Sequence, residues 1–209
     1  RIFGNSIVYV FEDDRVIGLI GVKDIVRENA KKTINELHRL GKETIMLTGD
    51  NKETAHLIAE AIGIKTVIAD VLPMEKTKVI KELQSQGKNV MMVGDGINDA
   101  PSLATAHIGV SINGGTDIAG DSADVILMHD NLERIISLLD ISKKTIQNIK
   151  ENLFWAFFYN LCMIPIAMGL LKSFGIMMNP MFAGLAMTLS SLTVVLNTLR
   201  LKKWRANNL

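Results

Sequence analysis

A single polar loop, with the string GDGINDAP at residues 94–101, constrains the fold of this chain more than any other stretch. It follows the run 89–93, which is short, continuous and largely apolar, as is typical of a buried strand. The loop places the carboxylates of Asp95 and Asp99 and the amide of Asn98 just past the carboxyl end of that strand, where ligands bind in open α/β sheets. Hard carboxylate oxygens suit Mg²⁺, which takes one or two carboxylates and keeps several waters. The string therefore predicts an α/β fold with a site for Mg²⁺ and phosphate, against the alternative of an ordinary acidic turn.

A second loop of the same design lies upstream, with the string TGDN at residues 48–51 after another short apolar run. The Thr48 hydroxyl and the backbone amides around Gly49 and Asp50 are suited to hold a phosphoryl oxygen. Between the two loops, Lys76 lies at the start of a helical pattern and would supply the positive charge that a transferring phosphoryl group needs. A lone lysine is more often a solvated surface residue, so this interpretation depends on the two loops.

Together the three segments resemble the phosphate site of the haloacid dehalogenase-like superfamily. The longer strings TGDN and GDGINDAPSLATAHIGVSI resemble one branch of it, the P-type ATPases. This resemblance implies a haloacid dehalogenase-like parallel-sheet phosphorylation domain, with ATP as substrate and Mg²⁺ as cofactor. It implies Mg²⁺ binding by Asp95 and Asp99, and a catalytic site made of Thr48, Gly49, Asp50, Lys76, Asn98 and Asp99. Asp24 matches the aspartate at the return hinge of that family.

The nucleophilic aspartate that this family phosphorylates is missing from the sequence. In P-type ATPases it opens an Asp-Lys-Thr-Gly-Thr string, and no such string occurs in the 209 residues. We therefore expect the chain to be the carboxyl-terminal part of a longer protein, with a phosphorylation domain that lacks its nucleophile strand. By itself the chain is expected to be inactive.

The apolar periodicity and the turn residues predict alternating strands and helices in the first two-thirds of the chain. The pattern predicts a β-hairpin over 7–20, helices over 21–41, 53–62, 75–84 and 101–106, and strands over 44–47, 66–68, 89–93, 107–112 and 123–128. Strands that alternate with helices favour βαβ units and a parallel sheet. We expect three parts: the tail of a nucleotide-binding domain over 1–20, the phosphorylation domain over 21–135 and a membrane domain over 136–209.

Charge is distributed unevenly, and this predicts the membrane domain. Between Glu151 and Arg200 the only charged residue is Lys172. The runs at about 152–171 and 180–199 each have the length of one membrane-spanning helix, which is about 20 apolar residues. Basic residues before the first run and after the second place the phosphorylation domain and the carboxyl terminus in the cytoplasm by the positive-inside rule. The lipid bilayer is therefore an expected partner, whereas a formal net charge of +1 argues against nucleic acid.

Polar residues inside a membrane span are costly and suggest a function. The first run contains Tyr159 and Asn160, and the second contains Met187, Ser190 and Ser191. If the two helices are antiparallel, both sets lie roughly 11–18 Å from the cytoplasmic ends. A thioether selects soft ions, Cu⁺ above all. The alternative is that these small and polar residues hold the helices together, with methionine as filler.

The pair Tyr-Asn in one span and Met-x-x-Ser-Ser in the next resembles the Cu⁺-transporting heavy-metal P-type ATPases. The resemblance implies Cu⁺ ligands at Tyr159, Asn160, Met187 and Ser191, with Ser190 as their neighbour. Zinc-transporting relatives are expected to carry a lysine in the first span and an aspartate in the second, and neither is present. The expected protein is an integral, multi-pass, ATP-driven copper exporter, and upstream regions would be the place for a copper chaperone to bind. The alternatives are a pump for Ag⁺ or Zn²⁺, a membrane-anchored phosphatase of the same superfamily, or an inactive fragment.

Overall fold

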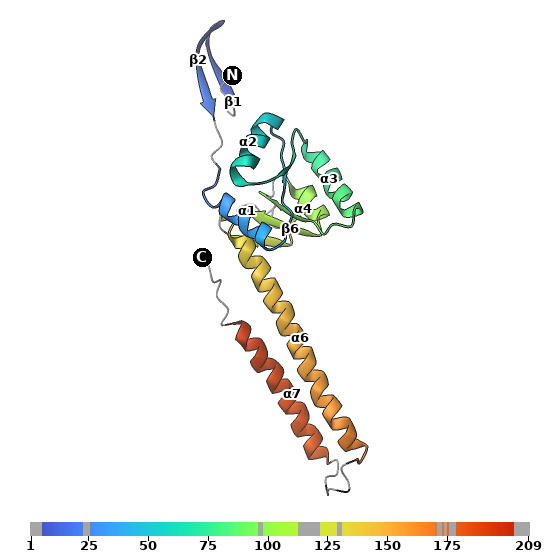
Figure 1. The fold of residues 1–209 in the computed structure, drawn as a ribbon. Helices are drawn as coiled ribbons and strands as arrows, with labels where there is room; N and C mark the ends of the chain where they lie inside the picture. The colour runs from blue at the N-terminus through green and yellow to red at the C-terminus, as the bar shows by residue number, and fades with distance from the viewer. Residues whose placement is uncertain are drawn as a thin grey trace. The chain divides into compact units, whose positions relative to one another are not determined.

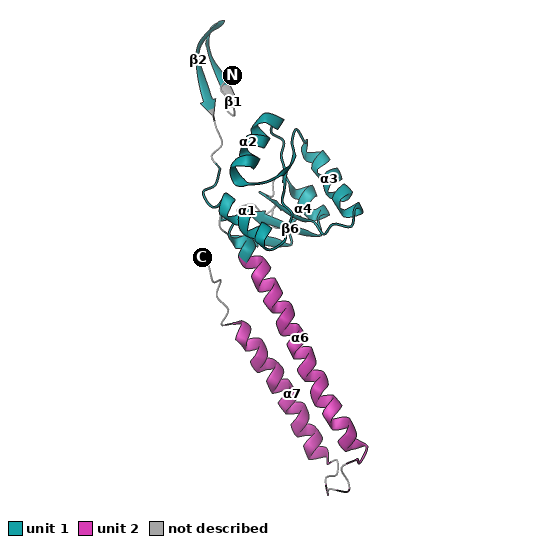
Figure 2. Cartoon of the chain, viewed as in Figure 1, with its two compact units in different colours: residues 1–136 teal, residues 137–209 magenta. Residues whose placement is uncertain are grey.

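The structure is a computed structural model, and it describes residues 6–22, 26–95, 98–112, 122–128, 131–170, 173, 175 and 179–202. Figure 2 shows its two compact units, Arg1–Ile136 and Ser137–Leu209, in different colours. The first unit contains the α/β elements with both polar loops, and the second contains the two apolar runs.

The first unit opens with an antiparallel hairpin made of β1 (Ser6–Glu12) and β2 (Arg15–Val22). Its turn is the acidic segment that the sequence indicated, and Asp13 there has a positive φ of 49°. The register shifts between Val10 and Phe11, which marks a bulge. The predicted hairpin is therefore confirmed. Its apolar side chains are largely exposed, so the hairpin has no core of its own.

The rest of the first unit alternates strands and helices, as the sequence predicted (Figure 1). The elements follow in the order α1 (Ala30–Arg39), β3 (Ile45–Leu47), α2 (Lys52–Ile62), β4 (Thr66–Ile68), α3 (Pro73–Ser85), β5 (Met91–Gly94), α4 (Ala100–Thr105), β6 (Ile108–Ile112) and β7 (Val125–Leu127). The helix predicted over 21–41 is wrong at its start, because Gly21 and Val22 belong to β2 and α1 begins at Ala30. Gly63 ends α2 in the left-handed conformation, with φ of 86°, which a glycine adopts at little cost.

The strands of this part pair in parallel, which confirms the predicted α/β class. Among the described residues they form two separate sheets, β3–β4 and β5–β6–β7. In the first sheet Leu47 pairs with Ile68, and in the second Gly94 pairs with Ser111. Both polar loops therefore leave the carboxyl ends of parallel strands, the edge at which ligands bind in such sheets.

A small core holds α3 and α4 against β5. Ile80 from α3, Met92 from β5 and Leu103 from α4 are buried against one another, with exposed fractions of 1%, 9% and 0%. Gly109 in β6 permits the close approach of α4, since a Cβ there would lie 2.6 Å from the Leu103 carbonyl oxygen. This packing fixes the two segments that carry Lys76 and Asp99.

The second unit consists of two antiparallel helices, α6 (Arg134–Ala167), whose first residues belong to the first unit, and α7 (Pro180–Leu201) (Figure 1). Within the described residues, α7 is the one helix that is long and apolar enough to cross a membrane. The first predicted span, 152–171, falls in the second half of α6 and does not meet that criterion. Asn152, Tyr159 and Asn160 lower its hydropathy, and the helix ends at Ala167. That span therefore stays a prediction.

Candidate functional site

The loop after β3 is held by its own side chains. The Thr48 hydroxyl donates to Asp50 Oδ2 at 2.9 Å and accepts from the Asp50 backbone N–H at 3.1 Å. Asn51 then caps α2 by accepting a hydrogen bond from the Thr54 backbone N–H at 2.9 Å. Thr48 is half-buried, whereas Gly49 and Asp50 are exposed. The turn therefore presents its backbone to solvent with the hydroxyl already oriented.

The segment that leads into α3 touches this loop. The Val71 N–H donates to the Thr48 carbonyl oxygen at 3.2 Å, and the Asp70 N–H donates to the Asp50 carbonyl oxygen at 2.9 Å. Asp70 adopts a left-handed φ of 57°, so the chain turns sharply before the helix. The positive end of the α3 dipole lies at Pro73, three residues before Lys76. These backbone contacts could not be predicted, because hydrogen bonds between loops leave no residue pattern in the sequence.

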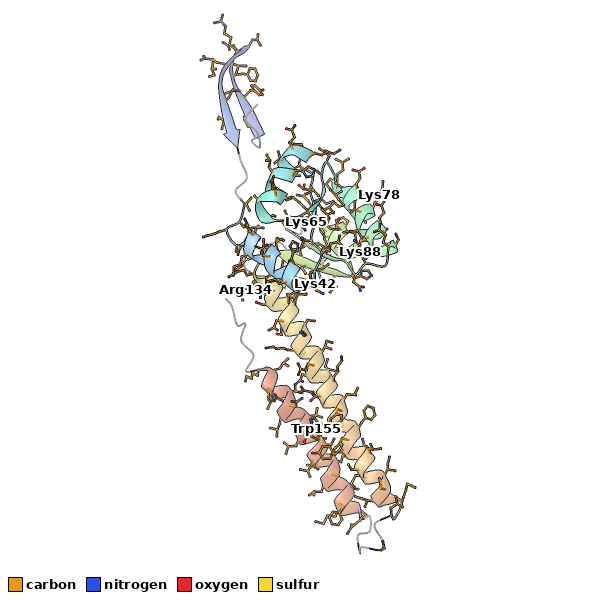
Figure 3. The ribbon with its side chains drawn as sticks, viewed as in Figure 1. Lys42, Lys65, Lys78, Lys88, Arg134 and Trp155 are labelled. Carbon is orange, nitrogen blue, oxygen red and sulfur yellow. The ribbon has the colours of Figure 1, made fainter. Side chains whose placement is uncertain are left out.

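Lys76 contacts the second loop directly. Its Nζ lies 2.6 Å from Asp99 Oδ1, and the two side chains are only 15% and 13% exposed. An ammonium group has three N–H donors, so this ion pair leaves two for other partners. Lys78, two residues further along α3, is exposed at the surface (Figure 3). Lys78 is therefore a solvated surface lysine, whereas Lys76 is not.

The second loop requires a glycine at residue 94. A Cβ on Gly94 would lie 2.5 Å from Asp99 Oδ2 and 2.9 Å from Asp99 Cβ, so no other residue fits without moving that carboxylate. Asp95 and Asn98 are both exposed. The two residues between them lie outside the described range. Their carboxylate and amide oxygens are hard donors of the type that Mg²⁺ prefers, so the donor set fits that ion.

The first unit thus brings the predicted phosphate-site residues into one chain of contacts. Thr48 contacts Val71, α3 follows at once, and Lys76 of that helix binds Asp99. Asp24 lies outside the described residues. No group of three or more His, Cys, Asp or Glu side chains suited to a metal ion occurs in the part of the chain that the structure describes.

The predicted membrane-site residues of the second unit differ in their exposure. Tyr159 and Ser190 are half-buried, whereas Asn160, Met187 and Ser191 are exposed, Met187 to 75%. The Tyr159 hydroxyl lies 3.1 Å from Thr193 Oγ1, so it reaches α7. The Asn160 amide donates to the Ala156 carbonyl oxygen of its own helix at 2.9 Å. Trp155, labelled in Figure 3, belongs to the aromatic cluster around Tyr159, with ring centroids 6.4 Å apart.

A polar network that the sequence analysis did not identify joins the helices near the carboxyl end of α7. Asn197 is only 8% exposed, and its side-chain amide donates to Asn152 Oδ1 at 3.0 Å and to Glu151 Oε2 at 3.2 Å. Asn148 is also buried and donates to the Asn197 carbonyl oxygen at 3.0 Å. Asn148 and Asn152 at i, i+4 before one apolar run, together with Asn197 in the other, would have been the signal. Asn148 meets Asn197, whereas Tyr159, later in α6, meets Thr193, earlier in α7, so the two helices are antiparallel.

Glu151 is the acidic member of this network, and Arg200 is a basic one. Hydrogen bonds from Gln147 and then Asn197, with a smaller contribution from the Arg200 guanidinium, lower the pKa of its carboxyl below the ordinary 4.5. The Gln147 amide donates to Glu151 Oε1 at 3.0 Å. Because the lowered pKa favours the ionised form, Glu151 accepts from both helices at neutral pH.

The chain belongs to the haloacid dehalogenase-like hydrolases, whose family model matches residues 1–107. It is 50% identical over 203 residues to the copper-exporting P-type ATPase of Staphylococcus aureus strain JH9, and equally so to that of strain Newman. These alignments cover 97% of this chain and 24% of each relative. The chain therefore spans about a quarter of the length of these curated relatives.

Solved structures agree with this placement. A zinc-transporting PIB-type ATPase in an E2·Pi state superposes with a TM-score of 0.79 at 35% identity, covering 95% of this chain and 32% of that one. The catalytic domain of the CPx-ATPase CopB-B superposes with a TM-score of 0.51 at 28% identity, covering 62% of this chain and 52% of that one. The resemblance to heavy-metal P-type ATPases found in the sequence is confirmed.

Proposed function

We propose that this chain is the carboxyl-terminal part of a P-type ATPase that exports Cu⁺ at the expense of ATP. The observation that carries the proposal is the combination of two features in one chain. Lys76 and the two polar loops form one connected group in a haloacid dehalogenase-like fold. The same chain continues into a helix pair with Tyr159, Asn160, Met187 and Ser191, in which the thioether suits a soft ion.

In this proposal the first unit supplies the electrostatics of phosphoryl transfer, which dominate catalysis of that kind. The Thr48 hydroxyl and the amides of Gly49 and Asp50 hold phosphoryl oxygens, for which Thr48 and Asp50 exchange the hydrogen bonds that they make to each other. Lys76 adds a positive charge. Asp95 would hold Mg²⁺, which would supply positive charge to the phosphoryl group, and Asn98 completes the loop. Asp99 anchors Lys76 and lies beside the metal position.

The nucleophilic aspartate comes from another part of the longer protein. We infer that its strand adds to the sheet between β3 and β5. In support, the described strands form two parallel sheets instead of one, and both β3 and β5 end in a loop of the candidate site. A parallel strand inserted there would present an aspartate at its own carboxyl end, beside both loops.

Copper is favoured over zinc by the membrane residues and by the relatives. The spans lack the lysine and aspartate expected of zinc pumps. The relatives at 50% identity are named copper exporters, whereas the zinc-transporting structure is 35% identical. A soft thioether at Met187 accepts Ag⁺ as readily as Cu⁺ by its chemistry, so silver is the expected surrogate.

The proposal also gives the chain its location. The full protein is integral to the membrane and multi-pass, with α7 and the second half of α6 in the bilayer and the phosphorylation domain and carboxyl terminus in the cytoplasm. Lipid, ATP and Cu⁺ are its partners, and a copper chaperone would deliver the ion to upstream regions.

Metal-stimulated ATP hydrolysis by the full-length protein tests the proposal. We expect Cu⁺ and Ag⁺ to stimulate hydrolysis and Zn²⁺ to leave it near the level found with a chelator. Stimulation by Zn²⁺ alone would contradict the copper assignment. Hydrolysis of small phosphate esters without any metal-stimulated ATPase activity would favour the membrane-anchored phosphatase.

A further inference from the structure

Tyr159, a residue of the predicted ion site, contacts Thr193, which lies outside that site. The two side chains are half-buried between α6 and α7, and their oxygens are 3.1 Å apart. Thr193 Oγ1 also donates to the Leu189 carbonyl oxygen, one turn earlier in α7, at 2.8 Å. These two bonds share a single threonine hydroxyl.

The proton count decides the direction of the interhelical bond. A threonine hydroxyl has one proton and two lone pairs. Its proton is committed to the Leu189 carbonyl, which has no proton to offer in return. The phenol of Tyr159 must therefore donate its proton to Thr193 Oγ1.

A phenol that donates its proton in one fixed direction keeps its lone pairs for another partner. The proton of Tyr159 points at α7, so its oxygen presents lone pairs on the opposite side, where a cation could be bound without repulsion from the O–H dipole. The bond also restricts the torsion of the hydroxyl and the position of the ring, which lies in the aromatic cluster with Trp155 and Phe158. Such preorganisation lowers the cost of binding a ligand.

We propose that Thr193 is a positioning residue for the cation site, acting through Tyr159 by fixing its phenol as a lone-pair donor. This inference rests on the proposed function, in which Tyr159 is a ligand of Cu⁺. Thr193 itself does not touch the ion. Thr193 contributes to Cu⁺ binding through the phenol of Tyr159, so replacing Thr193 should have no effect on Cu⁺ binding when the phenol is absent.

Thr188 provides a matched control on the same helix. Its hydroxyl also donates to the carbonyl oxygen one turn earlier, that of Gly184, at 2.9 Å, and it is exposed. Replacing either threonine by valine keeps the shape and the β-branch and removes the hydroxyl. Both variants lose the hydroxyl bond within the helix, and Thr193→Val also loses the bond to Tyr159.

The test measures the Cu⁺ concentration for half-maximal ATP hydrolysis by the full-length protein. One neutral hydrogen bond is worth about 0.5–1.5 kcal/mol, so Thr193→Val should raise that concentration roughly 2- to 10-fold, with a smaller change in the maximal rate. Thr193→Ser, which keeps a hydroxyl, should stay close to wild type, and Thr188→Val should equal wild type. In a Tyr159→Phe background, Thr193→Val should add nothing.

Two results would overturn the positioning role. One is a Thr193→Val protein with the same half-maximal Cu⁺ concentration as Thr188→Val. The other is that Thr193→Val raises the half-maximal Cu⁺ concentration by the same factor in the wild type and in the Tyr159→Phe protein. That result would mean that Thr193 acts through packing. If the valine variant is not recovered as folded protein, the same cycle with Thr193→Ala gives the same two outcomes. A wild-type protein without any Cu⁺ stimulation would instead contradict the proposed function itself.

Discussion

At the scale of single residues, the ion pair between Lys76 and Asp99 organises the first unit. Both side chains are mostly buried, so each charge depends on the other for its stabilisation. Gly94 is part of the same arrangement because only a residue without a side chain leaves room for the Asp99 carboxylate. Lys76, Gly94 and Asp99 are thus interdependent, and a change in any one of them should affect the other two.

Lys76→Met should destabilise the first unit by about 3–5 kcal/mol, because it leaves a buried carboxylate without a partner. The double variant with Asp99→Asn should recover part of the loss. Amide hydrogen exchange of α3 and α4 measures the effect locally. Lys78→Met, at an exposed position of the same helix, is the control and should leave exchange unchanged. Equal exchange in the two methionine variants would show that the ion pair is unimportant for folding.

Gly94→Ala should move Asp99, since the new Cβ would lie 2.5 Å from its carboxylate. Overpacking of this kind typically costs about 1–3 kcal/mol. We expect faster hydrogen exchange around α4, measured together with loss of phosphorylation in the full-length protein. Gly18→Ala, where nothing lies within 4 Å of the new carbon, is the control. A Gly94→Ala protein as protected as this control would disprove the steric argument.

At the scale of elements, the sequence predicted the order and type of strands and helices well, because apolar periods and glycines mark them. The helix predicted over 53–62 ends at Ile62 before Gly63, and the predicted hairpin over 7–20 is formed by β1 and β2. The predicted start of α1 at residue 21 was wrong because Gly21 and Val22 continue β2, and the helix begins at Ala30. Pairing between distant residues could not be predicted, because neither the contact of Lys76 with Asp99 nor that of Tyr159 with Thr193 leaves a local pattern.

The α6–α7 pair should weaken in acid through Glu151. Its carboxyl has a pKa below the ordinary 4.5, first through the hydrogen bond from Gln147 of the same helix and then through that from Asn197 of α7. The second of these bonds favours the paired helices when Glu151 is ionised. That stabilisation is fully present above pH 4.5 and is lost as pH falls through the lower, folded-state value. Thermal unfolding followed by tryptophan fluorescence reports on the second unit, since Trp155 and Trp204 both belong to it. Glu151→Gln should abolish this acid-dependent loss; an unchanged pH profile would exclude Glu151 as its source.

At the scale of the whole molecule, the account requires coupling between chemistry and ion binding. Tyr159 lies about 25 residues along α6 from its first residue, roughly 37 Å at the rise of an α-helix. Lys76 and both polar loops belong to the first unit, whereas Tyr159 and Met187 belong to the second. An ion held near Tyr159 and Met187 can influence phosphorylation only by favouring one conformation of the protein over another.

The most direct test of this account is the amount of phosphoenzyme that the full-length protein forms from ATP with Cu⁺ present, compared between wild type and Met187→Leu. Leucine keeps the volume of methionine and removes the sulfur. Met181→Leu is the matched control, because Met181 is on the same helix and equally exposed, 76% against 75%. We predict that Met187→Leu loses Cu⁺-dependent phosphorylation by ATP but is still phosphorylated by inorganic phosphate without copper, while Met181→Leu behaves as wild type. Ordinary copper stimulation of the Met187→Leu protein would contradict the account and leave Met187 as a packing residue.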